Sequence, residues 1–420
     1  MKEKRSNNRS MIYPRQKLYD IRFGNYLKEF FFKSKKIKDN SFINNFSSFI
    51  GCEPSDVIPL PMGRLSLYLA VKATITRNKK EVIMNPFTIY DMVNMVICAG
   101  GIPKFIDPSA PPHLTLKDVK KNLTKNSCLV LLTHYHSSNK EVVSIANYLK
   151  KKKIYLMEDC AISLGSKISN THVGMHGDFA LFSFGIFKFI SSYLGGALFV
   201  KNKTLRKKIF SDVKRWDQMS IGHLCPHFFK AFKFHFFTRK FVFNYFTFQI
   251  FKFGYLRNIK LIKNQAKNDP SPQIKYLLDK NYKLQPTVYQ KKEWNRQLKN
   301  IDSDRKKRLE NAFSYYENLK CNPHIKIPYP DRETDCFLNF PILVKEKEKL
   351  ICYLIKNNVD ISPYFYRVCS EEKVFQEFGE SCPNMQEYEK TLITLPNYPS
   401  IPKLAIRHIS QLINKFYLKA

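Results

Sequence analysis

The chain has 420 residues, 44% of them hydrophobic and 14% aromatic, so it can bury a large core and is not a disordered polypeptide. Its 70 Lys and Arg residues outnumber 35 Asp and Glu residues, and the resulting formal charge of +35 favours anionic partners such as nucleotides or anionic lipid. No zinc-finger, RNA-recognition or helix-turn-helix pattern accompanies this charge, so we expect no nucleic-acid partner.

The cysteines and the N-terminus bear on the compartment. The ten cysteines stand singly, and no CxxC pair or Cys/His cluster offers the spacing of metal ligands, so we expect no metal site. Unpaired cysteines are typical of a reducing compartment. The basic N-terminus (Met1 to Arg9) is not followed by an apolar segment of signal-peptide or membrane-spanning length. We therefore expect a cytoplasmic protein, with peripheral attachment to the inner face of the membrane as a further hypothesis.

Short apolar runs rich in β-forming residues alternate with helical patterns between residues 60 and 200. The expected strands are Val82–Met84, Lys104–Ile106, Cys128–Leu132, Ile154–Met157, Phe179–Phe182 and Ala197–Val200. The expected helices between them are Leu65–Ala73, Tyr90–Ala99, Leu116–Leu123 and Glu141–Lys151. This alternation predicts an α/β fold with a mostly parallel sheet that is covered by helices on both faces.

The composition changes after the predicted sheet. Residues 218–268 contain nine Lys and Arg residues and no Asp or Glu, within a phenylalanine-rich stretch whose period fits neither helix nor strand clearly. The stretch ends at Asp269-Pro270-Ser271-Pro272, a turn signal. It has two interpretations: a helical layer with a solvated basic rim, or an interfacial surface for anionic lipid or for the pyrophosphate of a substrate.

The rest of the chain predicts a second, smaller domain. A long helical pattern covers Val288 to Leu319, and the tail alternates a strand at Leu338–Val344 with helices at Glu346–Lys356 and Leu404–Phe416. We accordingly divide the chain into an N-terminal helical segment (1–50), a large domain (51–204), a basic aromatic insert (205–275), and a return helix with a small α+β domain (276–420).

Three positions in the large domain are candidates for catalytic or ligand-binding roles. Asp159 follows a buried strand, at the sheet edge where ligands bind in parallel folds. Lys188 lies between apolar residues five positions after a serine, and burial would lower the pKa of its amine as a Schiff-base lysine requires. Gly63 opens a helix whose backbone N–H groups could hold a phosphate. Taken alone, each pattern also fits a helix cap, a surface lysine or an ordinary helix start.

In this order and spacing, the three positions belong to a series of motifs that resembles the DegT/StrS-type sugar aminotransferase family. The segments that carry the resemblance are Glu81-Val82-Ile83, Ala99-Gly100-Gly101 through Asp107, Thr133-His134-Tyr135, Glu158-Asp159-Cys160-Ala161, Gly177-Asp178, Ser183-Phe184, Lys188 before Gly195-Gly196, Asn281-Tyr282-Lys283-Leu284 and Leu395-Pro396. The resemblance implies the fold type I architecture of pyridoxal-phosphate enzymes, with a seven-stranded-type sheet and a smaller C-terminal domain.

The resemblance also implies pyridoxal 5′-phosphate as cofactor and assigns the catalytic roles. Lys188 would carry the cofactor covalently and would then move a proton to and from the substrate carbon. Asp159 would pair with the pyridine nitrogen and keep it protonated, so that the ring acts as an electron sink. Lysine at position 188 argues against the dehydratase branch of the family, where histidine takes that place.

The remaining implied contacts surround the cofactor. Ser183 and the N–H groups of Gly63 and Arg64 would bind its phosphate, and Ala161 and Ile89 would cover the two faces of its ring. Asn281 would reach the phosphate from the neighbouring subunit, which implies a homodimer, and Lys283 would bind substrate.

Four positions depart from the family pattern. Ile89 replaces an aromatic residue, Ile162 replaces Gln or His, Arg64 replaces Thr, and Lys283 replaces Arg. The departures bear on substrate and cofactor affinity rather than on the lysine chemistry, and Arg64 could add a charged contact to the phosphate.

The resemblance leads to one expected function and two alternatives. We expect transfer of an amino group, with L-glutamate as donor, to a nucleotide-linked keto-sugar in polysaccharide or lipopolysaccharide biosynthesis. The first alternative is the same chemistry on a cyclitol or another ketone. The second is a cofactor-binding regulatory or membrane-associated protein with little turnover.

Overall fold

The structure is a computed structural model that describes residues 12–18, 22–24, 26, 40–259, 262, 272–361 and 366–418. Most of the expected N-terminal segment 1–50 lies outside these residues. Its longest described element is helix α2 (Ser41–Ile50), which ends at Gly51 in the left-handed conformation.

A seven-stranded sheet forms the centre of the large domain, in the order β1-β10-β9-β6-β5-β2-β4. The strands are β1 (Val57–Leu60), β2 (Glu81–Met84), β4 (Ile102–Phe105), β5 (Ser127–Thr133), β6 (Tyr155–Asp159), β9 (Phe179–Ser183) and β10 (Gly196–Val200). Strand β10 is antiparallel to both of its neighbours, and the others share one direction. The expected mostly parallel sheet is therefore confirmed, with β1 as a strand that the sequence analysis missed.

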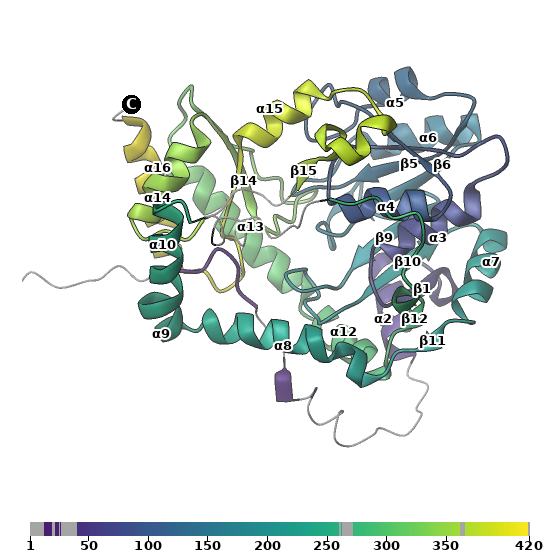
Figure 1. The fold of residues 1–420 in the computed structure, drawn as a ribbon, viewed down its shortest axis with the longest axis horizontal. Helices are drawn as coiled ribbons and strands as arrows, with labels where there is room; N and C mark the ends of the chain where they lie inside the picture. Colours follow the sequence, from purple (N-terminus) through teal and green to yellow (C-terminus); the bar gives the residue numbers. More distant parts are fainter. Residues whose placement is uncertain are drawn as a thin grey trace, which may run out of the picture.

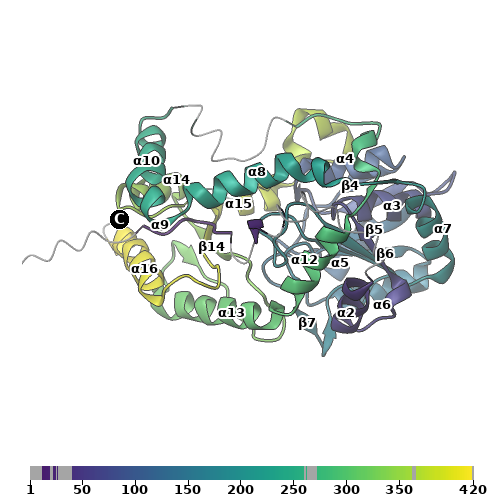
Figure 2. The same ribbon diagram turned by 90° about the horizontal axis from the view of Figure 1, so that it is seen from below.

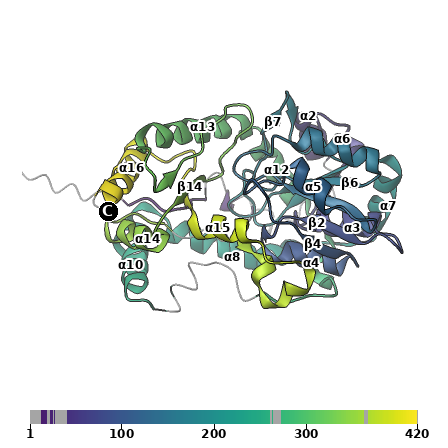
Figure 3. The ribbon, with the colours of Figure 1, turned by 90° about the horizontal axis from the view of Figure 1, so that it is seen from above.

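Helices cover both faces of the sheet, which is why its strands are almost entirely apolar. Helices α3 (Leu65–Thr74), α4 (Tyr90–Cys98) and α7 (Lys203–Val213) lie on one face, and α2 and α6 (Val142–Lys152) lie on the other (Figures 2 and 3). Helix α5 (Leu116–Asn122) packs beside α6 and begins at Thr115, whose hydroxyl accepts the Asp118 N–H at 3.1 Å. Seven of the ten residues of α3 from Leu65 onward are buried without a break, so this helix is enclosed rather than amphipathic.

The small domain contains the antiparallel strands β13 (Ile325–Lys326), β14 (Phe340–Val344) and β16 (Leu392–Leu395), packed against helices α13 (Ile301–Asn318), α14 (Lys347–Lys356) and α16 (Lys403–Leu418) (Figure 1). The single helix expected over Val288–Leu319 was wrong, because the chain forms α12 (Val288–Leu298) and then α13. Asn300 occupies the N-cap position of α13, and Asp302 and Asp304 lie in its first turn, where negative charge favours the start of a new helix.

Part of the C-terminal region returns to the large domain. Strand β15 (Arg367–Val368) pairs antiparallel with β3 (Phe87–Thr88). Helix α15 (Pro383–Thr391) begins with two N–H groups, from Asn384 and Met385, that each donate to the Asp107 carboxylate at 3.0 Å. These contacts tie residues 366–391 to the edge of the sheet near β4.

The basic aromatic insert is helical, which resolves its ambiguous sequence period. Helix α8 (Ile221–Phe237) is followed by α9 (Lys240–Val242), the π-helical turn η2 (Phe243–Thr247) and α10 (Phe248–Leu256). Helix α8 runs along one edge of the molecule from the large domain to the small domain, where α10 packs on α14 (Figures 1 and 2). None of the helices within the described ranges combines the length and apolarity needed to cross a bilayer.

Candidate active site

The carboxyl ends of two neighbouring strands place the predicted residues side by side. Asp159 is the last residue of β6, and Ser183 is the last residue of β9. The two strands are parallel and paired, with Asp159 opposite Leu181. Because parallel strands end at one edge of a sheet, both side chains lie at the edge where ligands bind in such folds.

Gly63 lies at the same edge, pressed against two other segments. A Cβ atom on Gly63 would stand 2.9 Å from the Phe182 oxygen and 2.9 Å from the Ser183 Cβ. A Cβ atom on Gly196 would stand 2.5 Å from the Gly63 nitrogen. Any side chain at either glycine would fill this space, so the start of α3, the end of β9 and the start of β10 meet backbone to backbone.

This meeting point fits a phosphate group. The N–H groups of Leu65, Ser66 and Leu67 donate to the carbonyls of Met62, Gly63 and Arg64, which fixes the first turn of α3. The N–H groups before that turn have no partner within the helix and can donate hydrogen bonds to an anion, and the helix dipole favours negative charge at this end. The Ser183 hydroxyl lies on the strand that faces the turn.

The side chain of Arg64 binds a carboxylate on another helix. Its guanidinium forms an ion pair with Asp91 in the first turn of α4, and the Lys275 Nζ lies 3.7 Å from the same carboxylate. The backbone amide of Arg64 therefore remains the group that this residue can offer to a phosphate.

Lys188 lies in a tight turn that follows β9. Its N–H donates to the Gly185 carbonyl at 3.2 Å, and the preceding Phe187 has a φ of 67°. A bulky residue in this left-handed conformation costs on the order of 1–3 kcal/mol, so neighbouring contacts must hold the turn. The Phe187 ring meets Phe234 of α8 with centroids 4.6 Å apart.

A second set of contacts, made by Ser192 and Trp294, holds the segment that contains Lys188. The Ser192 hydroxyl donates to the Phe184 carbonyl at 2.5 Å and accepts a hydrogen bond of 2.9 Å from the Trp294 indole. Trp294 also fills the space beside Gly195, where an added Cβ would come within 2.4 Å of the indole ring. The Gly195-Gly196 motif is thus explained by two close approaches, one to Trp294 and one to Gly63.

The surroundings of Lys188 lower the pKa of its amine. Burial lowers its pKa to about 8, the charge of Arg64 acts in the same direction, and the carboxylate of Asp159 opposes them. At pH 7 roughly a tenth of such an amine is neutral, compared with well under a thousandth for an ordinary lysine. The neutral form is the one that attacks a carbonyl carbon or accepts a proton.

Asp159 is a buried acid at the end of β6. Its carboxylate is 8% exposed and accepts the Ala161 N–H at 3.0 Å. Burial raises its pKa, whereas this hydrogen bond and the charge of Lys188 oppose the rise. A protonated ring nitrogen beside the carboxylate would add a further opposing charge and stabilise the ionised acid.

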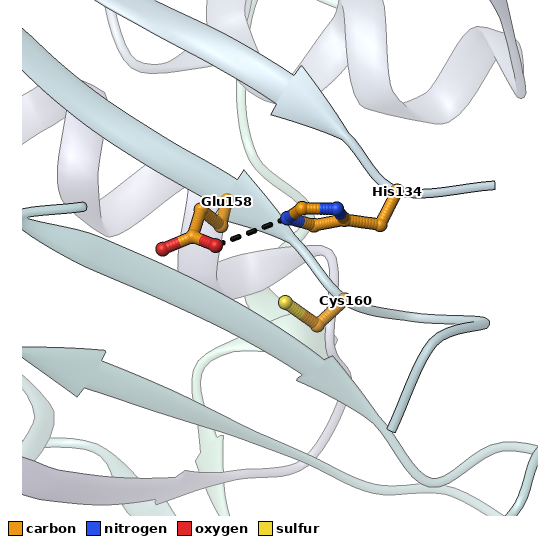
Figure 4. A group of neighbouring side chains, drawn as sticks. All are labelled: His134, Glu158 and Cys160. Carbon is orange, nitrogen blue, oxygen red and sulfur yellow. Dashed lines mark hydrogen bonds and ion pairs between the residues drawn. The ribbon is translucent and has the colours of Figure 1, made fainter. Parts of the chain in front are cut away.

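Glu158, the residue before Asp159, has a structural role that the sequence analysis did not assign. It is fully buried and accepts the His134 Nε2–H at 3.0 Å together with the N–H groups of Gly174, His176 and Gly177 at 2.7–2.8 Å (Figure 4). Burial alone would raise the pKa of Glu158, but the hydrogen bond and charge of His134 outweigh it and lower that pKa.

The group of His134, Glu158 and Cys160 also has the composition of a metal site (Figure 4). However, His134 Nδ1 accepts the Asn139 N–H at 3.1 Å, and its Nε2 is bound to Glu158. Both ring nitrogens and the carboxylate are used by hydrogen bonds, and burial raises the pKa of the Cys160 thiol well above its usual value. The cluster therefore fixes the ends of β5 and β6 in the shape that presents Asp159.

The other predicted residues divide into two groups. Ala161 and Ile89 are partly buried and pack onto the main core, Ala161 two residues after Asp159 and Ile89 directly after β3. Ile162 is 2% exposed and belongs to that core. Asn281 and Lys283 lie on an exposed turn (Lys280–Tyr282) and before β12 (Leu284–Gln285), outside the pocket that Lys188 lines.

That pocket contains residues that the sequence analysis missed. Besides Lys188 it is lined by Arg15, Gln16, Lys17, Phe187, Ser191, Arg308, Leu338, Asn339 and Tyr398. No acid is among these lining residues. Arg15 comes from the N-terminal segment and is held by Asp360, whose Oδ1 lies 2.6 Å from its Nη2. The basic composition of the N-terminal segment did not indicate that its residues would lie beside Lys188.

Comparison with known proteins identifies the family. A family model described as the DegT/DnrJ/EryC1/StrS aminotransferase family matches residues 28–219 and 287–414. The chain belongs to this family. The matched segments contain Lys188, Asp159 and the turn at Gly63, and they leave out residues 220–286, which hold α8 to α10 as well as Asn281 and Lys283.

Individual DegT/DnrJ/EryC1/StrS relatives agree with this assignment. A dTDP-4-amino-4,6-dideoxy-D-glucose transaminase of Shigella dysenteriae is 22% identical over 84% of this chain and 83% of its own length. A dTDP-4-dehydro-2,3,6-trideoxy-D-glucose 4-aminotransferase of Saccharopolyspora spinosa is 29% identical over 40% of this chain. Here the chain spans 44% of the relative's length, and two GDP-perosamine synthases are likewise matched over 37% and 40% of theirs.

Solved structures of the family share the fold. Helicobacter pylori PseC, an aminotransferase involved in the biosynthesis of pseudoaminic acid, aligns with a TM-score of 0.73 and 16% identity over 98% of this chain and 99% of that one. This likeness establishes the architecture of pyridoxal-phosphate transferases of fold type I. Pyridoxal 5′-phosphate is the cofactor of the DegT/DnrJ/EryC1/StrS family, and the glycine-lined phosphate cradle, Asp159 and Lys188 fit its phosphate, ring nitrogen and aldehyde.

Proposed function

We propose that this protein is an aminotransferase that moves an amino group from an amino acid, L-glutamate, to a nucleotide-linked keto-sugar. The observation that carries the proposal is a lysine with a pKa lowered to about 8, which lies at the sheet edge with Asp159 and opens onto a basic pocket. The names of the relatives reported above refer to dTDP-linked or GDP-linked sugars, and we propose for this chain a role in the biosynthesis of polysaccharide or lipopolysaccharide.

Each residue has a definite task in this reaction. Bound pyridoxal phosphate supplies an electron sink for the carbon that loses its proton. The Lys188 amine, once free, takes that proton on one side and returns it on the other, and its lowered pKa suits it to both directions near neutral pH. Asp159 holds a positive charge on the ring nitrogen, and the turn at Gly63 with Ser183 anchors the phosphate so that the ring stays oriented.

The positive charge around Lys188 favours an anionic substrate such as a nucleoside diphosphate. Arg15, Lys17 and Arg308 line it together with Lys188. Arg308 donates to the carbonyls of Leu338 and Asn397 at 2.8 and 2.7 Å, so its guanidinium is fixed in place. A fixed positive field attracts a nucleoside diphosphate more strongly than a neutral cyclitol, which favours the nucleotide-linked substrate.

The proposal is tested by incubating the cofactor-loaded protein with L-glutamate and a panel of dTDP-, UDP- and GDP-linked keto-sugars. We expect mass spectrometry to detect an amino-sugar nucleotide and an equal amount of 2-oxoglutarate. Turnover only with ketones that lack a nucleotide would favour the cyclitol alternative. Bound cofactor without turnover on any ketone would favour the regulatory alternative.

A shared active site is the expected consequence of a homodimer. Asn281 and Lys283 are exposed on one chain, which suits residues that act on the neighbouring subunit. We expect a Lys188→Ala variant and an Asn281→Ala/Lys283→Ala double variant each to be inactive and to recover up to about a quarter of wild-type activity when subunits are exchanged. Full activity of a species that sedimentation shows to be monomeric would contradict this arrangement.

A further inference from the structure

Helices α8 to α10 carry large hydrophobic side chains, most of them aromatic, that are exposed to solvent. Phe229 is 58% exposed, Phe241 65% and Ile250 64%, and the same surface carries Phe232, Phe236, Phe237, Tyr245, Phe246 and Phe253. We call these nine residues the aromatic stripe. Within α8 its members recur every three to four residues, so they share one face of the helix.

The opposite face of α8 already supplies the packing that the fold needs. The buried residues of this face, which pack in one cluster with Tyr193, Met219 and Tyr289, are Leu224, Phe228 and Ala231. Phe234 packs on Phe187, in the turn that contains Lys188. A surface helix normally presents polar residues away from the core, and a contiguous apolar patch of this size marks an interaction site. The aromatic stripe is therefore not explained by folding of the single chain.

The stripe is interleaved with positive charge. Lys230, Lys233, Arg239 and Lys240 are exposed among the aromatic residues, and residues 218–268 contain no Asp or Glu. By contrast Lys252 points inward, where it donates to the Lys356 carbonyl and to Asn358 at 2.8 Å. Arg257 is exposed as well, with its guanidinium 4.2 Å from the centre of the Phe253 ring, so five exposed cations accompany the stripe among the described residues of the insert. The sequence of the insert carries no acid to neutralise them.

A cavity opens within the same surface. It has a volume of about 520 Å³, and most of its lining consists of aromatic and aliphatic side chains of α8, η2 and α10, while Arg15, Gln16 and Asp360 add a polar side to it. Phe237, Phe246 and Ile250 belong both to its lining and to the aromatic stripe, so the cavity meets the exposed face. Such a space suits hydrocarbon better than a polar ligand.

We propose that α8 to α10 dock on the surface of an anionic phospholipid bilayer. The phenylalanines insert at the boundary between headgroups and acyl chains, and the five basic residues contact the anionic headgroups, a combination typical of interfacial helices. A second copy of this chain, meeting the stripe with its own stripe, would bring ten positive side chains together without an acid from either stripe, so charge complementarity favours the bilayer.

The proposal goes beyond the aminotransferase function and is tested without it. The full-length, cofactor-loaded protein is sedimented with vesicles of phosphatidylcholine alone or with 30% phosphatidylglycerol. We expect binding to the anionic vesicles only, and at least about tenfold weaker binding when salt is raised from 50 to 500 mM, because added salt screens the attraction.

Two variants separate charge from apolar insertion. Lys230→Gln/Lys233→Gln/Arg239→Gln/Lys240→Gln should weaken binding to anionic vesicles by at least about tenfold, and Phe229→Ser/Phe236→Ser/Phe241→Ser should do the same at unchanged charge. The matched control replaces four exposed lysines of α7 and its C-terminal end (Lys203, Lys207, Lys208 and Lys214) by Gln. This control loses the same charge and should bind as the wild type does.

The following results would contradict docking on a bilayer. Absence of vesicle binding at low salt, or equal loss of binding in the α7 control and the stripe variants, would overturn the docking surface. Stripe variants that dissociate the oligomer in sedimentation velocity, with wild-type vesicle binding absent, would assign the stripe to a contact between chains.

Discussion

Replacement of Lys188 by alanine is expected to abolish covalent attachment of the cofactor and to lower transamination by at least about 10⁴-fold, since both nucleophilic attack and proton transfer are lost. Borohydride reduction of the wild-type protein should fix the cofactor to a single peptide that contains Lys188. A Lys207→Ala variant on the exposed surface of α7 serves as the control and should keep both label and activity. A label on any other lysine would refute the assignment of Lys188.

The pH dependence of cofactor loading provides a second readout for Lys188. Burial lowers its pKa to about 8, so the amine loses its proton as the pH rises through 8 and is protonated below it. We expect the rate at which the apoprotein takes up cofactor to level off above pH 8 and to fall about tenfold for each pH unit below 7. A rate that keeps rising to pH 10 would mean that the amine behaves as an ordinary exposed lysine.

Replacement of Asp159 by alanine is expected to reduce the half-reaction with the amino donor by about 10³-fold or more while the fold is kept. The carboxylate keeps the ring nitrogen of the cofactor protonated, and without it the ring withdraws electrons poorly. Stopped-flow spectra of single turnovers measure this step directly. Glu310→Gln, on the exposed surface of α13, removes one acid that the site does not use and should have no effect.

Two further measurements make the Asp159 result decisive. Circular dichroism and thermal unfolding of Asp159→Ala should match the wild type, because the carboxylate accepts one local hydrogen bond, from the Ala161 N–H at 3.0 Å. Near-normal turnover in Asp159→Ala would show that another acid holds the nitrogen. Asp159→Glu, which keeps the charge but lengthens the side chain, should fall between the wild type and the alanine variant.

The sheet was predictable because its strands are buried on both faces. Runs such as Cys128–Leu132 and Phe179–Phe182 are continuously apolar, and this pattern over such short lengths fits a parallel strand better than a helix. Strand β1 (Val57–Leu60) was missed because Pro59 interrupts its apolar run and argues against a strand. Its place at the edge of the sheet explains why the proline is tolerated.

The site was predictable only where local motifs define it. Asp159, Ser183 and Gly63 lie at strand ends and a helix start, and their meeting follows from the topology of a parallel sheet. The approach of Arg15 and Lys17 to Lys188 depends on packing of the N-terminal segment across the molecule, and no local pattern encodes such a contact. The break at Asn300 was readable in principle from Asn followed by two acids, the pattern of a helix start.

The pairing of β3 with β15 sets an order of events during protein synthesis. The Cys369 thiol donates to the Thr88 carbonyl across 281 positions of sequence, and the Phe87 ring packs on Tyr366 and Tyr388. At a translation rate of 5–20 residues per second, roughly 15 to 55 s separate the appearance of the two strands. During that interval Phe87 and the edge beside Ile89 have no cover from the later residues. The edge beside Ile89 is therefore covered only after residues 366–388 have been synthesised, and a chain that stopped before them would lack this cover.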